Sequence, residues 1–431
     1  MKRLCTLLFL VCCASLAWAQ RQEAVTAAAD PSAGASLFNM QRQVLYGDIA
    51  YYQWTVQVGP GRYDRIRLHR VVREQRPYHP ASTAQAVMFL PGLPTYFVGL
   101  YIPPAISQSC ARDHSIAIFL AKNGIDVWGM DYRWALVPGQ TTDFRFMKRW
   151  GVSRDVEDAQ IALTIAREMR GDGIRPAGPL FVSGLSYGAG VSYGVAANDS
   201  QRPPRLRNVK GIIPLDCGVR YSEPDVQAEA CDSVDPLRSA IQGGNYYNDV
   251  RGMEQIGRLA IDAPNDTSPF APPLTNYQFD LVMATSPNDI IPWHFAGGFF
   301  DSTGMPTDLR FTDVRMWMDL LANNEPPYYP IQLDLEYAEG GCPKPHLEAV
   351  YTDHIGDVRV PIFLVGAGGG FGHYSDYTTT LTASTDITIR VVQLLSDDQR
   401  AEDYGHVDLL EATNAETLVW QPILAWIQAH P

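Results

Sequence analysis

Short apolar segments alternate with amphipathic segments between residues 86 and 218. The apolar segments are continuous or nearly so, which is typical of parallel strands that are buried on both faces of a sheet. They predict strands over 86–92, 125–133, 179–184 and 208–218. The segments between them have a helical pattern, at 113–124 and at 153–171, each ending at a glycine. This alternation predicts βαβ units and a mostly parallel sheet flanked by helices.

The alternation stops after residue 218 and resumes near the C-terminus. Residues 219–350 are rich in proline, asparagine, aspartate and aromatic side chains, and they are too numerous for a simple loop. Further strands are expected at 46–59, 62–74, 358–370 and 387–395, and a last helix at 414–430. We therefore expect one α/β core, formed by 45–218 and 351–431, with an inserted cap or lid region at 219–350.

The N-terminus has the pattern of an export signal. Lys2 and Arg3 precede an apolar run, and Ala17-Trp18-Ala19 fits the small-residue rule for cleavage. The run is shorter than the roughly 20 apolar residues that span a membrane. We expect a signal peptide at 1–19, a flexible segment at 20–44 and a secreted or periplasmic protein without an integral membrane segment.

The net charge and the cysteines bear on the partners, the disulfides and the metal sites that can be expected. The net charge of −13 argues against nucleic acid as a partner. Four cysteines follow the signal, and in an oxidising compartment they predict two disulfides, with three possible pairings. We expect Cys217–Cys231 as the local pair and Cys110–Cys342 as the other. No spacing of cysteine and histidine is typical of a metal site.

A G-x-S-x-G motif spans Gly184 to Gly188 and places Ser186 between a predicted strand and a predicted helix. A serine in such a strained turn is exposed as a nucleophile, and the flanking glycines let neighbouring backbone approach closely. The start of the helix also favours negative charge that develops nearby. The alternative is a turn in which small residues only allow close packing. The position of the motif favours the catalytic interpretation.

These motifs together resemble the α/β-hydrolase superfamily, and in particular its lipase and esterase branch. The resemblance is carried, in this order, by PGLP at 91–94, IDVWGMDYR at 125–133, GLSYG at 184–188 and GHVDLL at 405–410. It implies an α/β-hydrolase fold over about residues 45 to 430, a mostly parallel sheet flanked by helices and interrupted by the inserted cap region.

The resemblance also implies roles for single residues. Ser186 is the expected nucleophile and His406 the general base, with His294, His346, His354 and His373 as other candidates. The backbone N–H of Tyr187 is one expected donor to the oxyanion. Leu93, with Thr95 behind it, is the other, because Pro94 has no N–H. The superfamily usually has His-Gly in that loop, and this chain has Pro91-Gly92 in its place.

The resemblance implies that the acid that orients the histidine comes from the loop after the strand before last, which here is VPIFLVGA at 360–367. Asp376 is the first acid after the strand at 358–370, and the glycine run Gly368–Gly370 provides bends that bring it back to the site. Asp216, at the end of the preceding strand, is the alternative acid. Asp289 resembles an acid-bearing loop but lies in the insertion.

The sequence thus predicts a secreted serine hydrolase that cleaves carboxylic esters through a Ser-His-Asp triad. It predicts no cofactor and no metal. The aromatic-rich insertion indicates a small-molecule ester or lipid-like substrate, although these side chains could also form only the core of the cap. Two alternatives remain: a serine peptidase on the same fold, and a non-catalytic binding protein that keeps the fold.

Overall fold

The computed structural model describes residues 34–173, 175–287, 291–344 and 350–431. The predicted signal peptide at 1–19, Asp289 and His346 lie outside these ranges. Within the described ranges, no helix has both the length and the apolar character that crossing a membrane requires.

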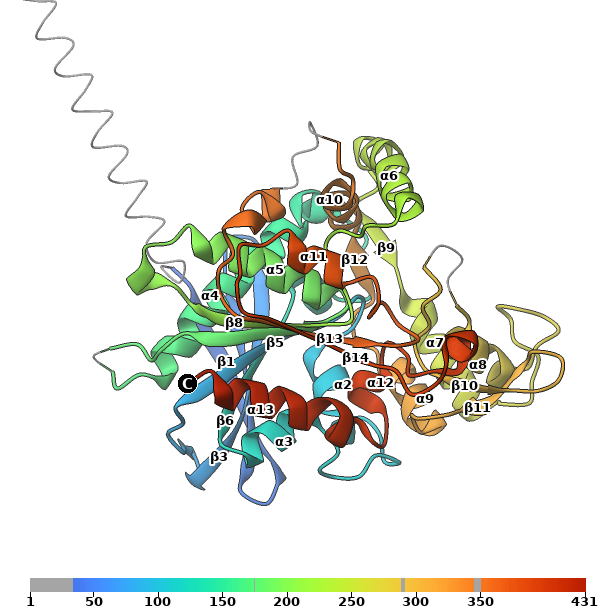
Figure 1. Ribbon diagram of the computed structural model, residues 1–431, viewed down its shortest axis with the longest axis horizontal. Helices are drawn as coiled ribbons and strands as arrows, with labels where there is room; N and C mark the ends of the chain where they lie inside the picture. Colours follow the sequence, from blue (N-terminus) through green and yellow to red (C-terminus); the bar gives the residue numbers. More distant parts are fainter. Residues whose placement is uncertain (1–33, 174, 288–290, 345–349) are drawn as a thin grey trace, which may run out of the picture.

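A ten-stranded sheet runs through the middle of the molecule, with helices on both faces (Figure 1). Its main path is β1-β2-β3-β6-β5-β7-β8-β13-β14, and β4 pairs with β3. Along this path, every neighbouring pair from β6-β5 to β13-β14 is parallel. The pairs β1-β2, β2-β3 and β3-β6 are antiparallel. The strands are β1 (Ser36–Tyr46), β2 (Ile49–Gln57), β3 (Arg65–Arg76), β4 (His79–Pro80), β5 (Gln85–Leu90), β6 (Ile125–Asp131), β7 (Leu180–Leu185), β8 (Val209–Leu215), β13 (Ile362–Ala367) and β14 (Ile387–Val392). This confirms the predicted mostly parallel sheet.

The helices cover the sheet because side chains alternate between its two faces. In β5, Val87 and Phe89 belong to the core under α3 and α13, whereas Met88 and Leu90 belong to the core under α4 and α5. The helices outside the insertion are α2 (Phe97–Tyr101), α3 (Ile116–Lys122), α4 (Val152–Arg170), α5 (Tyr187–Ser200), α11 (Asp376–Thr380), α12 (Asp408–Glu411) and α13 (Gln421–Ala429). Burial on both faces explains the continuous apolar strands in the sequence.

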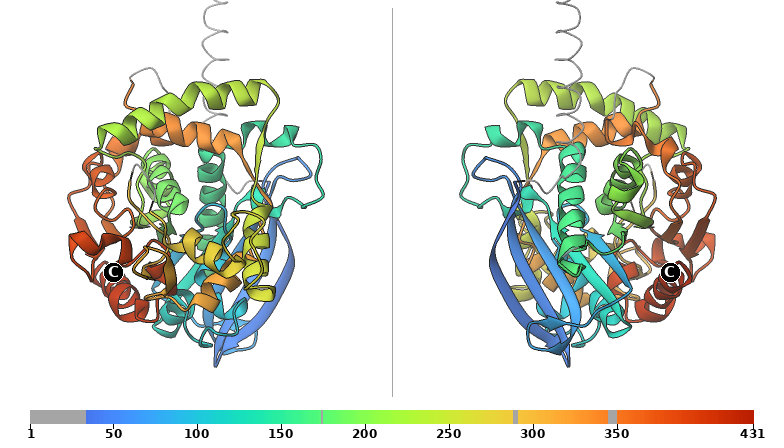
Figure 2. Two further views of the ribbon diagram at one scale, coloured as in Figure 1. Left: turned by 90° about the vertical axis from the view of Figure 1, so that its right-hand side faces the viewer. Right: turned by 90° about the vertical axis from the view of Figure 1, so that its left-hand side faces the viewer.

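The strands between residues 219 and 350 do not join the sheet. They pair only with one another, β9 with β12 and β10 with β11. The elements are α6 (Pro224–Gln242), β9 (Tyr247–Asp249), α7 (Arg251–Asp262), α8 (Asn276–Thr285), β10 (Gly298–Phe300), β11 (Pro306–Leu309), α9 (Val314–Ala322), β12 (Tyr328–Pro330) and α10 (Ile331–Gly341). Figure 2 shows α6 across the top of the molecule with α10 beneath it. We interpret this span as the cap.

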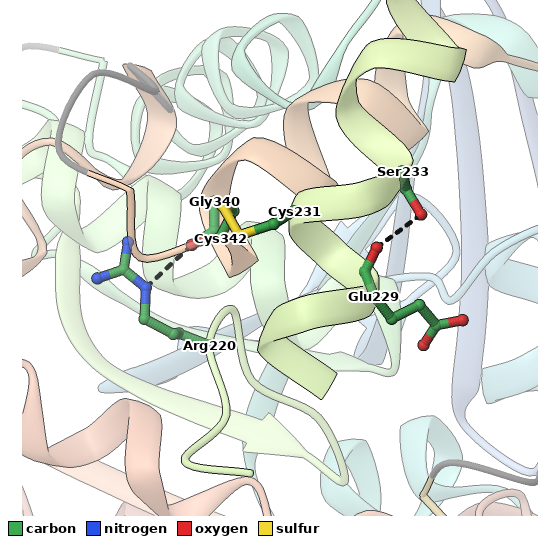
Figure 3. Close-up of a disulfide and its surroundings, with 6 residues drawn as sticks. All are labelled: Arg220, Glu229, Cys231, Ser233, Gly340 and Cys342. Atoms are coloured by element: carbon green, nitrogen blue, oxygen red, sulfur yellow. Dashed lines mark hydrogen bonds between the residues drawn. A yellow bond between two sulfur atoms is a disulfide. The ribbon is translucent and has the colours of Figure 1, made fainter. Parts of the chain in front are cut away.

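In the part of the chain that the structure describes, one disulfide, Cys231–Cys342, joins α6 to the residue that follows α10 (Figure 3). The predicted pairs Cys217–Cys231 and Cys110–Cys342 are therefore wrong, and Cys110 and Cys217 are free. Cys217 lies two residues after the end of β8, and its sulfur contacts the hydroxyls of Tyr221 and Tyr337. The antiparallel packing of α6 on α10 brings together two cysteines that are 111 residues apart.

The segment that we expected to be flexible, 20–44, contains most of β1. This strand, Ser36–Tyr46, pairs antiparallel with β2 and forms one edge of the sheet. Most of its side chains are exposed. A strand that buries little apolar surface needs no regular apolar alternation, so the sequence pattern does not reveal it.

Candidate active site

Ser186 lies in a sharp turn between β7 and α5. Its φ of 58° falls in the left-handed region, which is uncommon for a residue other than glycine. A Cβ at Gly184 would lie 2.4 Å from the carbonyl carbon of Gly188, and one at Gly188 would lie 2.1 Å from the carbonyl oxygen of Leu90. Both glycines of the motif are therefore required by close backbone approach. The turn holds Ser186 partly exposed above the sheet.

Asp216 is the partner of His406. Its Oδ2 lies 2.7 Å from His406 Nδ1, and both side chains are buried. Two backbone N–H groups also donate to the carboxylate, from Ala367 at 2.7 Å and from Phe371 at 3.0 Å. Asp216 follows β8 with a φ of 50°, so a second residue in the left-handed region turns its side chain toward the histidine.

Within the described residues, no hydrogen bond or ion pair joins His406 to Asp376, the acid that we favoured from the sequence. It is exposed and begins the short helix α11. The glycine run before it serves a different purpose, because a Cβ at Gly370 would lie 2.0 Å from Asp216 Oδ2. The run therefore lets the loop close around Asp216 instead of returning Asp376 to the site. The carboxylate bonded to His406 therefore belongs to Asp216, the alternative acid of the sequence analysis, and not to Asp376.

His406 lies in the loop that precedes α12. Its ring packs edge-on against Trp293 and Phe371, with ring centroids 5.4 Å apart in each pair. Its backbone N–H donates to the carbonyl oxygen of His294 at 2.9 Å. With the Asp216 carboxylate as the acceptor, Nδ1 carries the ring proton, so Nε2 is the basic nitrogen.

The other candidate histidines have different surroundings. His294 is buried, and its Nε2 lies 2.9 Å from the carbonyl oxygen of Asp403. Burial lowers the pKa of His294 below its ordinary value. Its ring and its backbone carbonyl thus both contact the loop that contains Asp403 and His406. His354 and His373 are exposed and lie beside Asp357 and Gln393.

The two expected oxyanion donors lie beside Ser186. Tyr187 is the first residue of α5, where a backbone N–H has no acceptor within the helix. A Cβ at Gly92 would lie 3.2 Å from the Cβ of Ser186, so the loop that contains Leu93 lies directly against the turn. The N–H of Thr95 already donates to the carbonyl oxygen of Gly92 at 3.0 Å. This leaves Leu93 as the second candidate.

A buried carboxyl group, that of Asp155, is hydrogen-bonded to the side chain of Tyr187 in this turn, and no sequence motif indicated it. The hydroxyl of Tyr187 donates to Asp155 Oδ2 at 2.7 Å, and Trp134 Nε1 donates to the same oxygen at 3.2 Å. Asp155 belongs to α4 and is fully buried. Burial raises the pKa of Asp155 to about 8, against the opposing effect of the two hydrogen bonds.

A cavity of about 500 Å³ opens over Ser186. Its floor includes Ser186, Tyr187 and Leu93. Its walls include Trp293 and Phe371, which also contact His406. Side chains of α6 and α10 close it from above. Most of these side chains are apolar or aromatic, and the volume is in the range that holds a small organic ligand.

Comparison with known proteins identifies the fold. No family model matches the chain, and no curated protein matches it. Among solved structures, a putative lipase from Sulfolobus solfataricus is similar, with a TM-score of 0.61 and 20% identity over 92% of this chain and 99% of that chain.

Two further structures are less similar. A monoglyceride lipase from Saccharomyces cerevisiae has a TM-score of 0.43 and 13% identity over 92% of this chain and 96% of its own. An esterase from Thermogutta terrifontis has a TM-score of 0.42 and 12% identity over 88% and 98%. At these identities the comparisons establish the architecture, and the fold conclusion rests on the Sulfolobus structure.

Proposed function

This chain has the α/β-hydrolase fold, and we propose that it is a serine hydrolase that cleaves carboxylic esters with a hydrophobic part. One observation carries the proposal. Ser186 lies on a strained strand-to-helix turn that opens into an apolar cavity, and His406, bound through Nδ1 to Asp216, contacts two aromatic walls of that cavity. The lipase and esterase names of the similar structures agree with this chemistry.

In the proposed reaction, Ser186 Oγ attacks the ester carbonyl carbon while His406 Nε2 takes its proton. The carbonyl electron pair moves to oxygen, and the N–H groups of Tyr187 and Leu93 stabilise this oxyanion. When the intermediate collapses, the C–O bond to the alcohol breaks and His406 returns the proton to the leaving oxygen. Water then attacks the acyl-enzyme by the same route and releases the acid. Asp216 keeps the imidazole oriented throughout.

The hydrophobic part of the substrate is assigned from the cavity. The helices α6 and α10 form the roof of the cavity. Leu237 on α6 and Leu333 on α10 face the cavity from this roof, and Trp293 and Phe371 line its walls. Burying an acyl chain among them gives about 0.8 kcal/mol for each methylene group. The Cys231–Cys342 bond in the roof agrees with a secreted or periplasmic location, because disulfides persist in oxidising compartments.

Fluorophosphonate labelling tests the nucleophile. We expect the probe to modify wild-type protein at Ser186 and to leave Ser186→Ala unmodified. Ser192→Ala is the matched control, because Ser192 lies on α5 and its hydroxyl donates to the carbonyl oxygen of Ala189. Absence of labelling in the wild type would exclude the serine hydrolase and favour a binding protein.

Substrate assays test the bond that is cleaved. We expect hydrolysis of p-nitrophenyl esters, with Ser186→Ala and His406→Ala each losing nearly all turnover because nucleophile and base act as a unit. Aminoacyl p-nitroanilides serve as the comparison. Faster cleavage of the anilides than of the esters would support the peptidase alternative.

A further inference from the structure

Two tyrosine hydroxyls tie together the loops that hold the proposed oxyanion donors. Tyr101 ends α2, and its side chain is fully buried. Its hydroxyl donates to the carbonyl oxygen of Leu90 at 2.7 Å and accepts from the N–H of Leu185 at 3.2 Å. Tyr132 is also fully buried, and its hydroxyl donates to the carbonyl oxygen of Pro91 at 3.3 Å.

The groups that Tyr101 joins are the last residues of two neighbouring strands. β5 ends at Leu90 and β7 ends at Leu185, and the parallel pairing of these strands stops at Leu90 and Gly184. Beyond this point the strands are no longer paired, and the N–H of Leu185 donates to the tyrosine hydroxyl instead of a β5 carbonyl. The hydroxyl therefore bridges the two strands where their pairing ends.

Each of these strands leads directly to one proposed donor. The chain runs from Leu90 through Pro91 and Gly92 to Leu93, and from Leu185 through Ser186 to Tyr187. An oxyanion held by two N–H groups requires both of them within hydrogen-bond distance of one oxygen, so small displacements of either loop weaken it. The Tyr132 ring also packs edge-on against Tyr187, with centroids 5.5 Å apart.

We propose that Tyr101, assisted by Tyr132, is a positioning residue that sets the separation of the Leu93 and Tyr187 N–H groups. This inference rests on the proposed function. Neither hydroxyl is assigned a contact with the substrate. Their effect is exerted through Leu90, Pro91 and Leu185, whose backbone groups they hold.

The residues around Tyr101 hold its ring in place and keep its hydroxyl protonated. Phe89 and Phe97 pack on the ring of Tyr101, with centroids 4.6 Å and 5.5 Å away. Burial raises the pKa of Tyr101 above its ordinary value, so the hydroxyl remains protonated and can donate and accept at once. A bridge of this kind adds no ionisation to the pH profile of the enzyme.

Tyr101→Phe tests the inference, with Tyr193→Phe as the matched control. Tyr193 is a fully buried tyrosine on α5 whose hydroxyl has no hydrogen-bond partner within the described ranges. Rates on a p-nitrophenyl ester and the Ki of an alkyl trifluoromethyl ketone are measured. Ser186 Oγ adds to this ketone and forms an oxyanion in the same hole, so the Ki reports on the hole. The Ki does not depend on how much of the sample is folded.

For Tyr101→Phe we expect kcat to fall about tenfold, less than the 10²–10³ that follows removal of a donor. KM should change little, the Ki should rise by the same factor as kcat falls, and the pH profile should keep its shape. Tyr193→Phe should resemble the wild type in kcat, KM and Ki. Tyr132→Phe should show the same pattern with a smaller effect.

Loss of activity through KM, or a Ki unchanged from that of Tyr193→Phe, would overturn the inference. If Tyr101→Phe does not accumulate as folded protein, Tyr132→Phe decides the question by the same measurements. Failure of the proposed function would give a different result, because wild-type protein would then neither react with fluorophosphonate nor bind the trifluoromethyl ketone.

Discussion

The carboxylate of Asp216 meets the three conditions for the acid of a catalytic triad. It is fully buried, it follows a strand of the central sheet, and it contacts the Nδ1 side of His406. Two backbone N–H groups fix its orientation. A carboxylate held in this way keeps the imidazole in the tautomer that leaves Nε2 free to take a proton.

Replacing this carboxylate by an amide should remove most of the activity. In Asp216→Asn the side chain keeps its shape but can donate to Nδ1 and so favours the wrong tautomer. We expect kcat to fall by up to about 10⁴, measured on a p-nitrophenyl ester. Asp376→Asn is the control, and because Asp376 is exposed and the carboxylate bonded to His406 is that of Asp216, it should keep wild-type activity. The reverse result would return the role to Asp376.

The sequence indicated the turn at Ser186 and singled out His406, but it favoured Asp376 over Asp216, whose carboxylate is the one bonded to His406 in the structure. Ser186 is marked by a local motif, whereas Asp216 and His406 are 190 residues apart. What brings them together is the left-handed backbone at Asp216 and the close packing of Gly370 against its carboxylate. A glycine run in a sequence shows that a loop can bend, but it does not show around which side chain the loop closes.

Asp155 should make the stability of the protein depend on pH. Its folded pKa of about 8 lies above the 3.8 of an unfolded chain, chiefly because of burial. Between these values the folded state binds more protons, so this group stabilises the fold fully below about pH 4. Its contribution falls as pH rises toward 8.

Asp155→Asn isolates this effect, because an amide can still accept from the Tyr187 hydroxyl but does not ionise. Urea unfolding at pH 5, 6.5 and 8 should show the variant gaining stability relative to wild type as pH rises, by at most about 1.4 kcal/mol per pH unit. A difference that stays constant over this range would mean that Asp155 does not titrate in it.

At the scale of the elements, α6 and α10 act as one unit above the cavity. The Cys231–Cys342 bond joins them, and Arg220 Nε donates to the carbonyl oxygen of Gly340 at 3.0 Å, which ties the end of α10 to the chain that leaves β8 (Figure 3). The hydroxyl of Tyr337 on α10 also donates to the carbonyl oxygen of Gly218 at 2.5 Å. The roof is thus attached next to Asp216.

Removing the disulfide should destabilise the protein. The bond closes a loop of 111 residues, and the chain-entropy model gives about 4.7 kcal/mol for a loop of roughly that length. We expect the double variant Cys231→Ser, Cys342→Ser to lose several kcal/mol in urea unfolding. Cys110→Ser is the control and should unfold like the wild type, because Cys110 is a free thiol. Equal stability of all three proteins would show that the roof does not depend on the bond.

The elements themselves were predicted well where they are buried on two sides. Strands β5, β6 and β7 are mostly apolar, and the structure places all three inside the sheet. The edge strand β1 buries little and was missed. The disulfide was missed because its pairing depends on how α6 packs against α10, which no local pattern encodes.

At the scale of the whole molecule, the proposed catalytic groups and the substrate cavity come from different parts of the chain. The central sheet positions the three residues, because Ser186 follows β7, Asp216 follows β8 and His406 lies between β14 and α12. The cavity above Ser186 is closed by helices of the span 219–350. On the proposed function, loops that follow the sheet strands supply the reacting groups, and residues 293–294 of the inserted span contact His406. The helices α6 and α10 limit the space that an acyl chain could occupy. Changes to the roof should alter the choice of substrate without altering the reaction.

Ala230 is the position at which this separation is best tested. It lies on α6, lines the cavity, and its Cβ would be 3.1 Å from a Cβ at Gly341. In Ala230→Trp the indole should occupy space that a long acyl chain needs. Each methylene excluded from the apolar cavity forfeits about 0.8 kcal/mol, so excluding two or more should lower kcat/KM for p-nitrophenyl octanoate at least about tenfold. The acetate ester should be hydrolysed as by the wild type.

The matched control is Ala228→Trp, because Ala228 is on the same helix but is exposed and does not line this cavity. It should leave both esters unaffected. Equal losses on acetate and octanoate in Ala230→Trp would mean that the indole disturbs the catalytic groups themselves. Unchanged rates on both would place the acyl chain outside the cavity under α6. Only a loss that grows with chain length, seen at Ala230 and not at Ala228, agrees with an acyl chain held between the sheet and the roof.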